Sequence, residues 1–250
     1  MRRANVLIAI LPASLALVLV ACGKDASTKS AAATVPATTT TAAPPTTTAE
    51  AVPPRSTNDG CRAVPAATRK EDSNRRRPRE RLSRKRDYIA TIRTNCGTIR
   101  IRLDVRRAPK TTASFAGLVR TRFFDGLAFN RIAKPGGNDF VIQGGDPQGN
   151  GEGGPGYIVV ETPPRGIRYR RYIVAMAKRP DQPPGTSGSQ FFIVTAADAG
   201  LDPVYALLGE VIGDKSAVQR IAAVPADPAA LEAPLDPVVL SSVRITSRRR

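Results

Sequence analysis

Two stretches of the chain combine one polar side chain with a run of apolar neighbours. Residues 129–146 (FNRIAKPGGNDFVIQGGD) carry Arg131 and, further along, Gln143. Residues 185–195 (GTSGSQFFIVT) carry Gln190 directly before Phe-Phe-Ile-Val. We expect the two runs to be neighbouring strands that line an apolar groove with one cation and a few amide donors. Such a groove suits an uncharged peptide that contains proline, and it suits neither a phosphate nor a metal.

The composition excludes several other kinds of site. The chain has no histidine, so it lacks the side chain that ordinarily titrates near neutrality, which argues against His-based triads and His-ligated metals. Its cysteines, Cys22, Cys61 and Cys96, are too few and too scattered for a zinc cluster. The glycine-rich segment 144–156 is followed by no GK[ST] and no helical pattern, so tight turns are favoured over nucleotide binding. The sequence predicts neither a metal nor a cofactor.

The N-terminal residues have the pattern of an export signal. A basic start, Met1-Arg2-Arg3, precedes an apolar run at 6–20, which is shorter than the about 20 residues of a membrane-spanning helix. The run ends in Leu-Val-Ala-Cys22, which resembles a bacterial lipobox. We therefore expect a signal peptide at 1–21, a lipidated Cys22, and a protein held on the extracytoplasmic face of the cell membrane. An ordinary cleaved signal and an uncleaved anchor are the alternatives.

Residues 22–86 are expected to form a disordered tether. The first part is rich in Thr, Ala and Pro and holds almost no large hydrophobic side chain. The second part, 69–86, is strongly basic, and either it is attracted to anionic lipid or cell-wall polymers or it is a solvated spacer. Nucleic acid is not expected as a partner, because this run lacks aromatic side chains for base stacking. In an exported protein Cys61 and Cys96 suggest a disulfide, with two free thiols as the alternative.

The folded domain is expected at 87–247, because the large hydrophobic residues gather there. Alternating strands and Gly/Pro turns predominate, and helices are expected at 109–121, which begins with a proline, and after Asp214 as N-cap. Residues 225–237 are expected to be irregular and 248–250 to fray. The pattern predicts a mainly β fold, an eight-stranded closed antiparallel barrel capped by two α-helices.

Six sequence blocks in order make a more specific identification. They are FNRI, FVIQGGDP, GGPGY, VAMAK, GTSGSQFFIVT and LDPVYALLGEV. From about 88 to 246 the chain resembles the cyclophilins, peptidyl-prolyl cis-trans isomerases that fold as an eight-stranded barrel capped by two helices. The layout of leader, cysteine, tether and domain resembles that of lipid-anchored bacterial members.

The resemblance implies roles for individual residues. Arg131 matches the catalytic arginine, and Phe140 and Gln143 stand beside it as further catalytic residues, with Gln143 holding the peptide backbone and helping to position Arg131. The proline pocket is expected from Phe140, Phe192 and Leu201, and Phe191 is expected in the core. The remaining substrate-binding positions are Ala177, Gln190 and Tyr205.

The chain also departs from the family at several positions. Asn130 replaces the usual histidine before the arginine, and about four extra residues around PGGN precede Phe140. The tryptophan that many members use to bind cyclosporin is replaced near Gly200, a groove histidine by Tyr205, and a pocket phenylalanine by Leu208. We expect weak cyclosporin binding, some change in the shape of the proline pocket, and retained catalysis.

These observations predict a monomeric, non-covalent isomerase whose partners are proline-containing polypeptides and, through its lipid, the membrane. Rotation about the prolyl amide moves no proton, and a guanidinium is always charged, so the absence of histidine does not count against this activity. One alternative is a catalytically weak proline-peptide-binding chaperone or scaffold lipoprotein. Another is a lipoprotein that binds wall polymers or other polyanions through residues 69–86.

Overall fold

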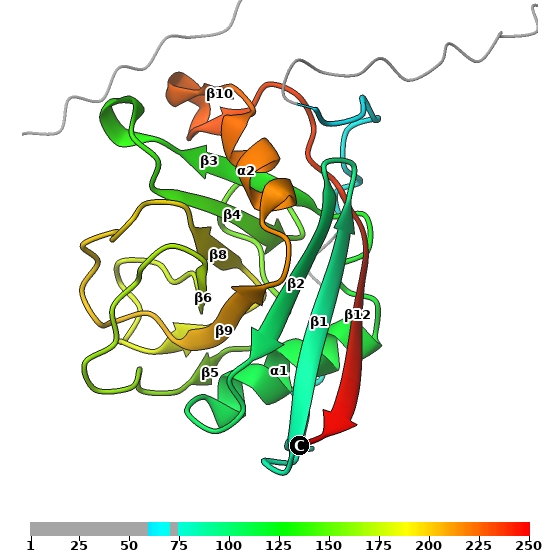
Figure 1. Ribbon diagram of the computed structural model, residues 1–250, viewed down its shortest axis with the longest axis vertical. Coiled ribbons are helices and arrows are strands. Elements are labelled where there is room, and N and C mark those ends of the chain that lie inside the picture. The colour runs from blue at the N-terminus through cyan, green and yellow to red at the C-terminus, as the bar shows by residue number, and fades with distance from the viewer. Residues whose placement is uncertain (1–59, 71–74) are drawn as a thin grey trace, which may run out of the picture. The chain divides into compact units, whose positions relative to one another are not determined.

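The structure is a computed structural model that describes residues 60–70 and 75–250 (Figure 1). The expected signal peptide, Cys22 and the Thr/Ala/Pro-rich part of the tether lie outside the described residues. Within the described ranges, no helix combines the length and apolar character needed to cross a membrane.

Eight antiparallel strands form one strongly curled sheet. Their order across the sheet is β12-β1-β2-β9-β6-β8-β4-β3 (Figure 1). The strands are β1 (Arg86–Thr94), β2 (Gly97–Leu103), β3 (Ala128–Ala133), β4 (Val141–Asp146), β6 (Ile173–Met176), β8 (Phe191–Val194), β9 (Leu207–Ile212) and β12 (Leu240–Arg249). The expected pairing of the two glutamine-bearing runs is confirmed, since β4 pairs with β8.

Short elements complete the fold. The two helices are α1 (Pro109–Arg120) and α2 (Ser216–Ala223). The small strands are β5 (Val159–Val160), which pairs with β7 (Thr186–Ser187), and β10 (Ala226–Asp227), which pairs with β11 (Ala233–Pro234). Two 3₁₀ turns, η1 (Pro135–Gly137) and η2 (Pro228–Ala230), lie next to β3 and between β10 and β11.

The prediction of a closed barrel was wrong, because the sheet stays open between β3 and β12. The two edges meet only near one end, where Ala128 and Val239 form an isolated bridge and backbone hydrogen bonds run from Phe129 N to Val238 O (2.9 Å), from Leu240 N to Leu127 O (2.7 Å) and from Gly126 N to Leu240 O (2.8 Å). Beyond that point β12 follows β1, while β3 is accompanied by the β10–β11 hairpin (Figure 1). The segment expected to be irregular therefore contains a hairpin that occupies the space of a closing strand.

The core lies between the curled sheet and the helices. Strand alternation buries one face of each of β1 and β2, with Ile92, Ile99 and Ile101 fully covered. Phe115 of α1 packs against Phe191 of β8 with ring centroids 6.0 Å apart. This places Phe191 in the main core, as predicted.

The helix predictions were nearly correct. Helix α1 begins at Pro109 as expected, and the carboxylate of Glu161 accepts hydrogen bonds from the backbone N–H groups of Lys110 and Thr111 in place of a local cap. At α2 the N-cap is Lys215 rather than Asp214, although the Asp214 carboxylate accepts a bond from Ser216 N (2.9 Å).

The predicted frayed C-terminus is instead ordered. Strand β12 continues to Arg249 and pairs with β1, and Arg250 Nε donates to Asp87 Oδ1 at 2.5 Å. This hydrogen bond, supported by the charges of Arg250 and Arg248, lowers the pKa of Asp87.

The chain already contacts the domain well before residue 87. We call residues 60–70 and 75–85 the strap. Its Cys61 forms a disulfide with Cys96, and its Leu82 is buried. Pro78 lies against Gly117 of α1, so close that a Cβ atom at position 117 would collide with the proline ring. The part of the expected tether that the structure describes thus packs against the domain.

Candidate functional site

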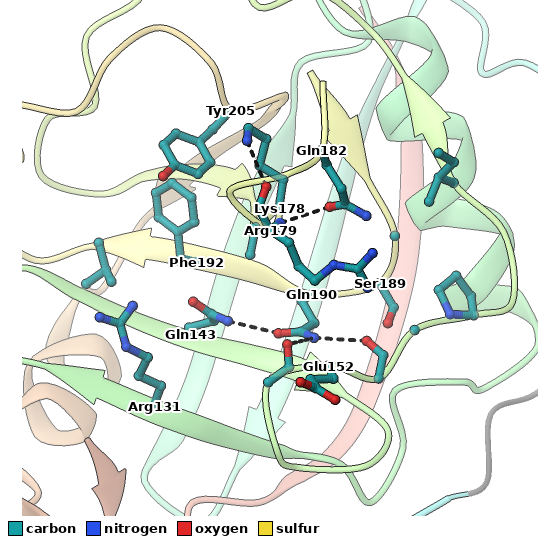
Figure 2. A pocket seen from close by; sticks show the side chains of 18 of the residues that line it. Arg131, Gln143, Glu152, Lys178, Arg179, Gln182, Ser189, Gln190, Phe192 and Tyr205 are labelled. Atoms are coloured by element: carbon teal, nitrogen blue, oxygen red, sulfur yellow. Dashed lines mark hydrogen bonds between the residues drawn. The ribbon is translucent and has the colours of Figure 1, made fainter. Parts of the chain in front are cut away.

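The structure brings all eight predicted groove residues together around one cavity of about 510 Å³ (Figure 2). They are Arg131, Phe140, Gln143, Ala177, Gln190, Phe192, Leu201 and Tyr205. We call this cavity the substrate groove. The glycine-rich loop, residues 147–156, contributes its far wall from Gly151 to Gly156.

Strand register aligns the central residues of the substrate groove. Arg131 on β3 lies opposite Gln143 on β4, and Gln143 lies opposite Phe192 on β8. Residues paired across neighbouring strands project from the same face of a sheet. A cation, an amide and an aromatic ring therefore stand in one row, and Figure 2 shows the Arg131 guanidinium beside the Gln143 side chain, on the side away from Gln190.

Three aromatic rings pack together at the apolar end of the groove. Phe192 contacts Tyr205 edge to face at 5.3 Å, and Tyr169 lies 6.2 Å from Phe192. The Tyr169 hydroxyl donates to Tyr205 O (2.6 Å) and accepts from Tyr205 N (3.0 Å). Burial raises the pKa of Tyr169 to about 12. Tyr169 was not among the predicted site residues, and it fixes the backbone of Tyr205 from behind the groove.

Gln190 joins the floor of the groove to the glycine-rich loop. Its Oε1 accepts a bond from Gln143 Nε2 (2.9 Å), and its own Nε2 donates to Gly151 O and Gly153 O, each at 2.9 Å (Figure 2). Asp146 accepts bonds from the loop N–H groups of Gln148 (2.8 Å) and Gly151 (2.5 Å). The loop is thus an ordered series of tight turns, as expected, and it forms a wall of the groove.

Glu232 is the side chain that holds Arg131. Its Oε2 lies 2.9 Å from Arg131 Nε and 2.7 Å from Nη2. Its other oxygen accepts from Lys134 N (3.2 Å), and its backbone oxygen accepts from Ile132 N (2.9 Å). Gln143 was expected to help position the arginine, but its amide bonds to Gln190 instead. Glu232 was missed because it lies in the segment that was expected to be irregular.

The positions that depart from the family differ in their surroundings. A Cβ atom on Gly200 would meet no atom within 4 Å, so the space beside this glycine, next to Leu201 of the groove, is open. Leu208 is fully buried in the main core and does not line the groove, so its expected effect on the proline pocket is wrong. The Asn130 side-chain oxygen is buried and has no hydrogen-bond partner among the described residues.

The described residues contain no group of three or more His, Cys, Asp or Glu side chains that could hold a metal. What the arrangement offers is one fixed guanidinium, amide groups and an aromatic pocket. This set can bind and polarise a neutral amide without forming a covalent bond.

The family model "Cyclophilin type peptidyl-prolyl cis-trans isomerase/CLD" matches residues 89–246, which include every residue of the predicted groove. The chain belongs to this family. Its members are peptidyl-prolyl cis-trans isomerases, and this cyclophilin is one of them.

Individual relatives support the assignment. The cyclophilin is 38% identical over 178 residues to peptidyl-prolyl cis-trans isomerase B of Streptomyces anulatus, covering 64% of this chain and 97% of that one. It is 37% identical over 175 residues to peptidyl-prolyl cis-trans isomerase A of Mycobacterium tuberculosis, covering 63% and 91%.

Solved structures agree with the sequence relatives. A crystal structure of a cyclophilin-type isomerase of Cryptosporidium parvum superposes with a TM-score of 0.58 at 28% identity, covering 65% of this chain and 99% of that one. A second structure of that protein, in the presence of the dipeptide Ala-Pro, gives a TM-score of 0.57 at 29% identity, covering 64% and 99%.

Proposed function

We propose that this cyclophilin accelerates X-Pro isomerisation in exported proteins, with Arg131 stabilising the twisted prolyl amide inside the substrate groove. The observation that carries the proposal is the row formed by Arg131, Gln143 and Phe192 on one face of the sheet. A proline ring held against Phe192 has its amide nitrogen on the side from which the guanidinium approaches.

To accelerate isomerisation, the groove must bind the twisted prolyl amide more tightly than the planar one. The barrier to rotation is about 18–20 kcal/mol, because the planar amide loses conjugation as it twists. The prolyl nitrogen then regains a lone pair, and a donor that contacts it only in that state lowers the barrier. Arg131 can provide this donor from Nη1, which forms no hydrogen bond or ion pair with any described residue while Nε and Nη2 bind Glu232.

In this proposal Gln143 and the aromatic side chains of the groove assist Arg131. Gln143 presents its amide oxygen to the groove, because its Nε2 is committed to Gln190. The aromatic side chains Phe192 and Tyr205 exclude water from the ring, which strengthens the single hydrogen bond from the guanidinium. No step transfers a proton, so the rate constant should be flat between about pH 6 and pH 8.

An Ala-Pro peptide assay tests the activity. We expect Arg131→Ala to lower kcat/KM by about 10²–10³, the usual effect of removing one preorganised donor. Arg93→Ala is the matched control, since Arg93 is exposed and its side chain has no bond or ion pair among the described residues. Equal rates for wild type and Arg131→Ala, with peptide binding retained, would favour the chaperone or scaffold alternative.

The proposal places the protein on the extracytoplasmic face of the cell membrane as a monomer anchored through Cys22. Its support is the basic start, apolar run and lipobox-like ending of the first 22 residues. Two acyl chains hold a protein stably where one does not, since each buried methylene adds about 0.8 kcal/mol. Cys22→Ala should release the protein from membranes in cell fractionation, and continued membrane retention of that variant would argue against lipidation.

A further inference from the structure

The strap carries arginines that have no counter-charge among the residues that the structure describes. Arg76, Arg77, Arg79 and Arg81 are exposed and form no hydrogen bond or ion pair with any residue that the structure describes. The one acid among them, Glu80, is paired with Arg120 at 3.3 Å. An unpaired group of cations on one surface creates a positive potential that attracts anionic ligands.

The four arginines border a hollow rather than a flat surface. With Lys110 of α1 they line a depression of about 890 Å³, whose floor includes Ala113, Ser114 and Val159. We call it the cationic groove. The nearby carboxylate of Glu161 is already engaged by the backbone N–H groups of Lys110 and Thr111, so it does not reach out to the arginines.

The cationic groove adjoins the substrate groove. Arg75, directly before these arginines, donates its backbone N–H to Pro155 O (3.1 Å), and Pro155 lines the substrate groove. Ser114 lines the cationic groove, and its hydroxyl lies 3.1 Å from the hydroxyl of Tyr157, which lines the substrate groove. The two hollows therefore share a wall.

Exposed apolar side chains mark this wall. Ile158 lines the substrate groove and is 51% exposed, and Val160 of β5 is 44% exposed. Val159 between them faces the cationic groove. A polypeptide that leaves the substrate groove past Ile158 would next meet the lining of the cationic groove, which begins at the neighbouring Val159.

We propose that the cationic groove binds an acidic segment of the client polypeptide, on one side of the proline that is isomerised. The inference rests on the proposed isomerase function and adds a substrate class to it. Single exposed ion pairs are weak, so the effect comes from several together and appears mainly as faster association and lower KM. Continuity with the substrate groove favours a polypeptide over a membrane surface as the ligand.

The test uses the full chain and matched peptides. All contain the same Ala-Pro centre, and a tail of four residues, either Glu or Gln, is attached through a short Gly/Ser spacer on the N-terminal or the C-terminal side. In low salt we expect kcat/KM to be about tenfold higher for the Glu tail on one of the two sides, mainly through KM, and we expect 0.5 M salt to remove the difference.

Two variants with equal loss of charge decide whether the strap is responsible. Replacing Arg76, Arg77, Arg79 and Arg81 by Gln should abolish the preference and leave the rate on Gln-tailed peptides unchanged. The control replaces four other exposed arginines by Gln and should keep the preference. They are Arg93, Arg100, Arg106 and Arg249, whose side chains form no hydrogen bond or ion pair among the described residues.

The contrary outcomes are distinct. No preference for Glu tails on either side, with Gln-tailed peptides isomerised normally, overturns the acidic-client inference and leaves the isomerase proposal standing. Failure to isomerise any peptide overturns the isomerase proposal itself. If the preference is absent but binding to phosphatidylglycerol vesicles is lost in the strap variant and kept in the control, the cationic groove is a membrane-binding surface instead.

Discussion

Arg131 and Glu232 form an ion pair in which one carboxylate oxygen contacts both Nε (2.9 Å) and Nη2 (2.7 Å) of the guanidinium. Two contacts to one planar group fix its orientation as well as its position. The Glu232 backbone is in turn bonded to Ile132 on the arginine's own strand. Glu232 is therefore a positioning residue that acts through Arg131.

Glu232→Gln is expected to lower kcat/KM about tenfold, with most of the loss in kcat, because a mobile guanidinium spends less time at the prolyl nitrogen. Glu232→Asp should recover part of the rate. In the Arg131→Ala background the same Gln substitution should have no further effect, since residues that act as a unit are non-additive. Peptide isomerisation kinetics on wild type, the two single variants and the double variant measure this coupling.

Glu210→Gln is the matched control for this prediction. Glu210 forms an exposed pair with Arg102 at 3.2 Å on strands β9 and β2 and does not line the substrate groove. It should leave the kinetics unchanged. Additive effects of Glu232→Gln and Arg131→Ala would show that Glu232 does not work through the arginine.

Gln190→Leu is expected to damage both stability and substrate binding. The change leaves the Gln143 amide and the carbonyls of Gly151 and Gly153 without their partner. The bond to Gly153 is buried and the other two are half-buried, and one buried unpaired group costs about 1–3 kcal/mol. The free energy of unfolding should fall by about 2 kcal/mol, and KM should rise as the glycine-rich loop loosens. Urea unfolding and peptide kinetics test both effects.

Gln219→Leu serves as the comparison for Gln190→Leu, because Gln219 is exposed on α2 and its side chain has no bond among the described residues. It should leave both quantities within error of wild type. A Gln190→Leu protein with unchanged KM would mean that the loop does not depend on this amide.

Tyr169 should make the fold sensitive to alkaline pH. Its pKa is raised to about 12 in the folded protein by burial, against about 10 in the unfolded chain. Between these values the folded state holds a proton that the unfolded state has lost, so the free energy of unfolding falls as pH rises. The stabilisation is complete below about pH 10 and is lost as pH rises through about 12.

Chemical unfolding of wild type and Tyr169→Phe from pH 9 to pH 12 measures this contribution. The variant should be less stable below pH 10, because Tyr205 loses its bonds to the hydroxyl, and its stability should decline less steeply above pH 10. Parallel curves for the two proteins above pH 10 would contradict the assignment to Tyr169.

Reduction of the Cys61–Cys96 disulfide is expected to destabilise the folded protein. The bridge spans 35 positions, and closing a loop of this size lowers the entropy of the unfolded chain by an amount equivalent to about 3–4 kcal/mol. Cys61→Ser should lower the free energy of unfolding by about that much. In dithiothreitol the free energy of unfolding of the wild type should fall to that of the variant, while that of the variant should not change. A melting temperature of wild type that ignores the reductant would contradict the prediction.

The groove could be predicted from the sequence because its determinants are local. Arg131, Gln143 and Phe192 lie on strands with clear apolar runs, and alternation along a strand separates Phe192 from Phe191 without any three-dimensional information. The family blocks then assign a role to each position.

Long-range features could not be predicted in the same way. Whether β3 and β12 pair depends on where residues 225–237 fold back, and that hairpin turns through Leu231 and Glu232 with positive φ at non-glycine residues, which no sequence rule signals. Glu232 was missed for the same reason. The strap has the composition of a disordered segment, but it is held to the domain by the Cys61 disulfide, by the packing of Pro78 and Leu82, and by hydrogen bonds such as those of Lys70 to Pro147 O and Phe123 O.

The contact between Pro78 and Gly117 bears on how the protein can be shortened. Helix α1 has a notch at Gly117 that the proline ring fills, and Leu82 is covered beside the domain. A protein that begins at residue 87 would still contain the whole family match, which starts at residue 89. It would, however, open that notch to water and leave Cys96 as a free thiol. Recombinant forms that keep residue 60 onward preserve the helix surface on which the strap is built.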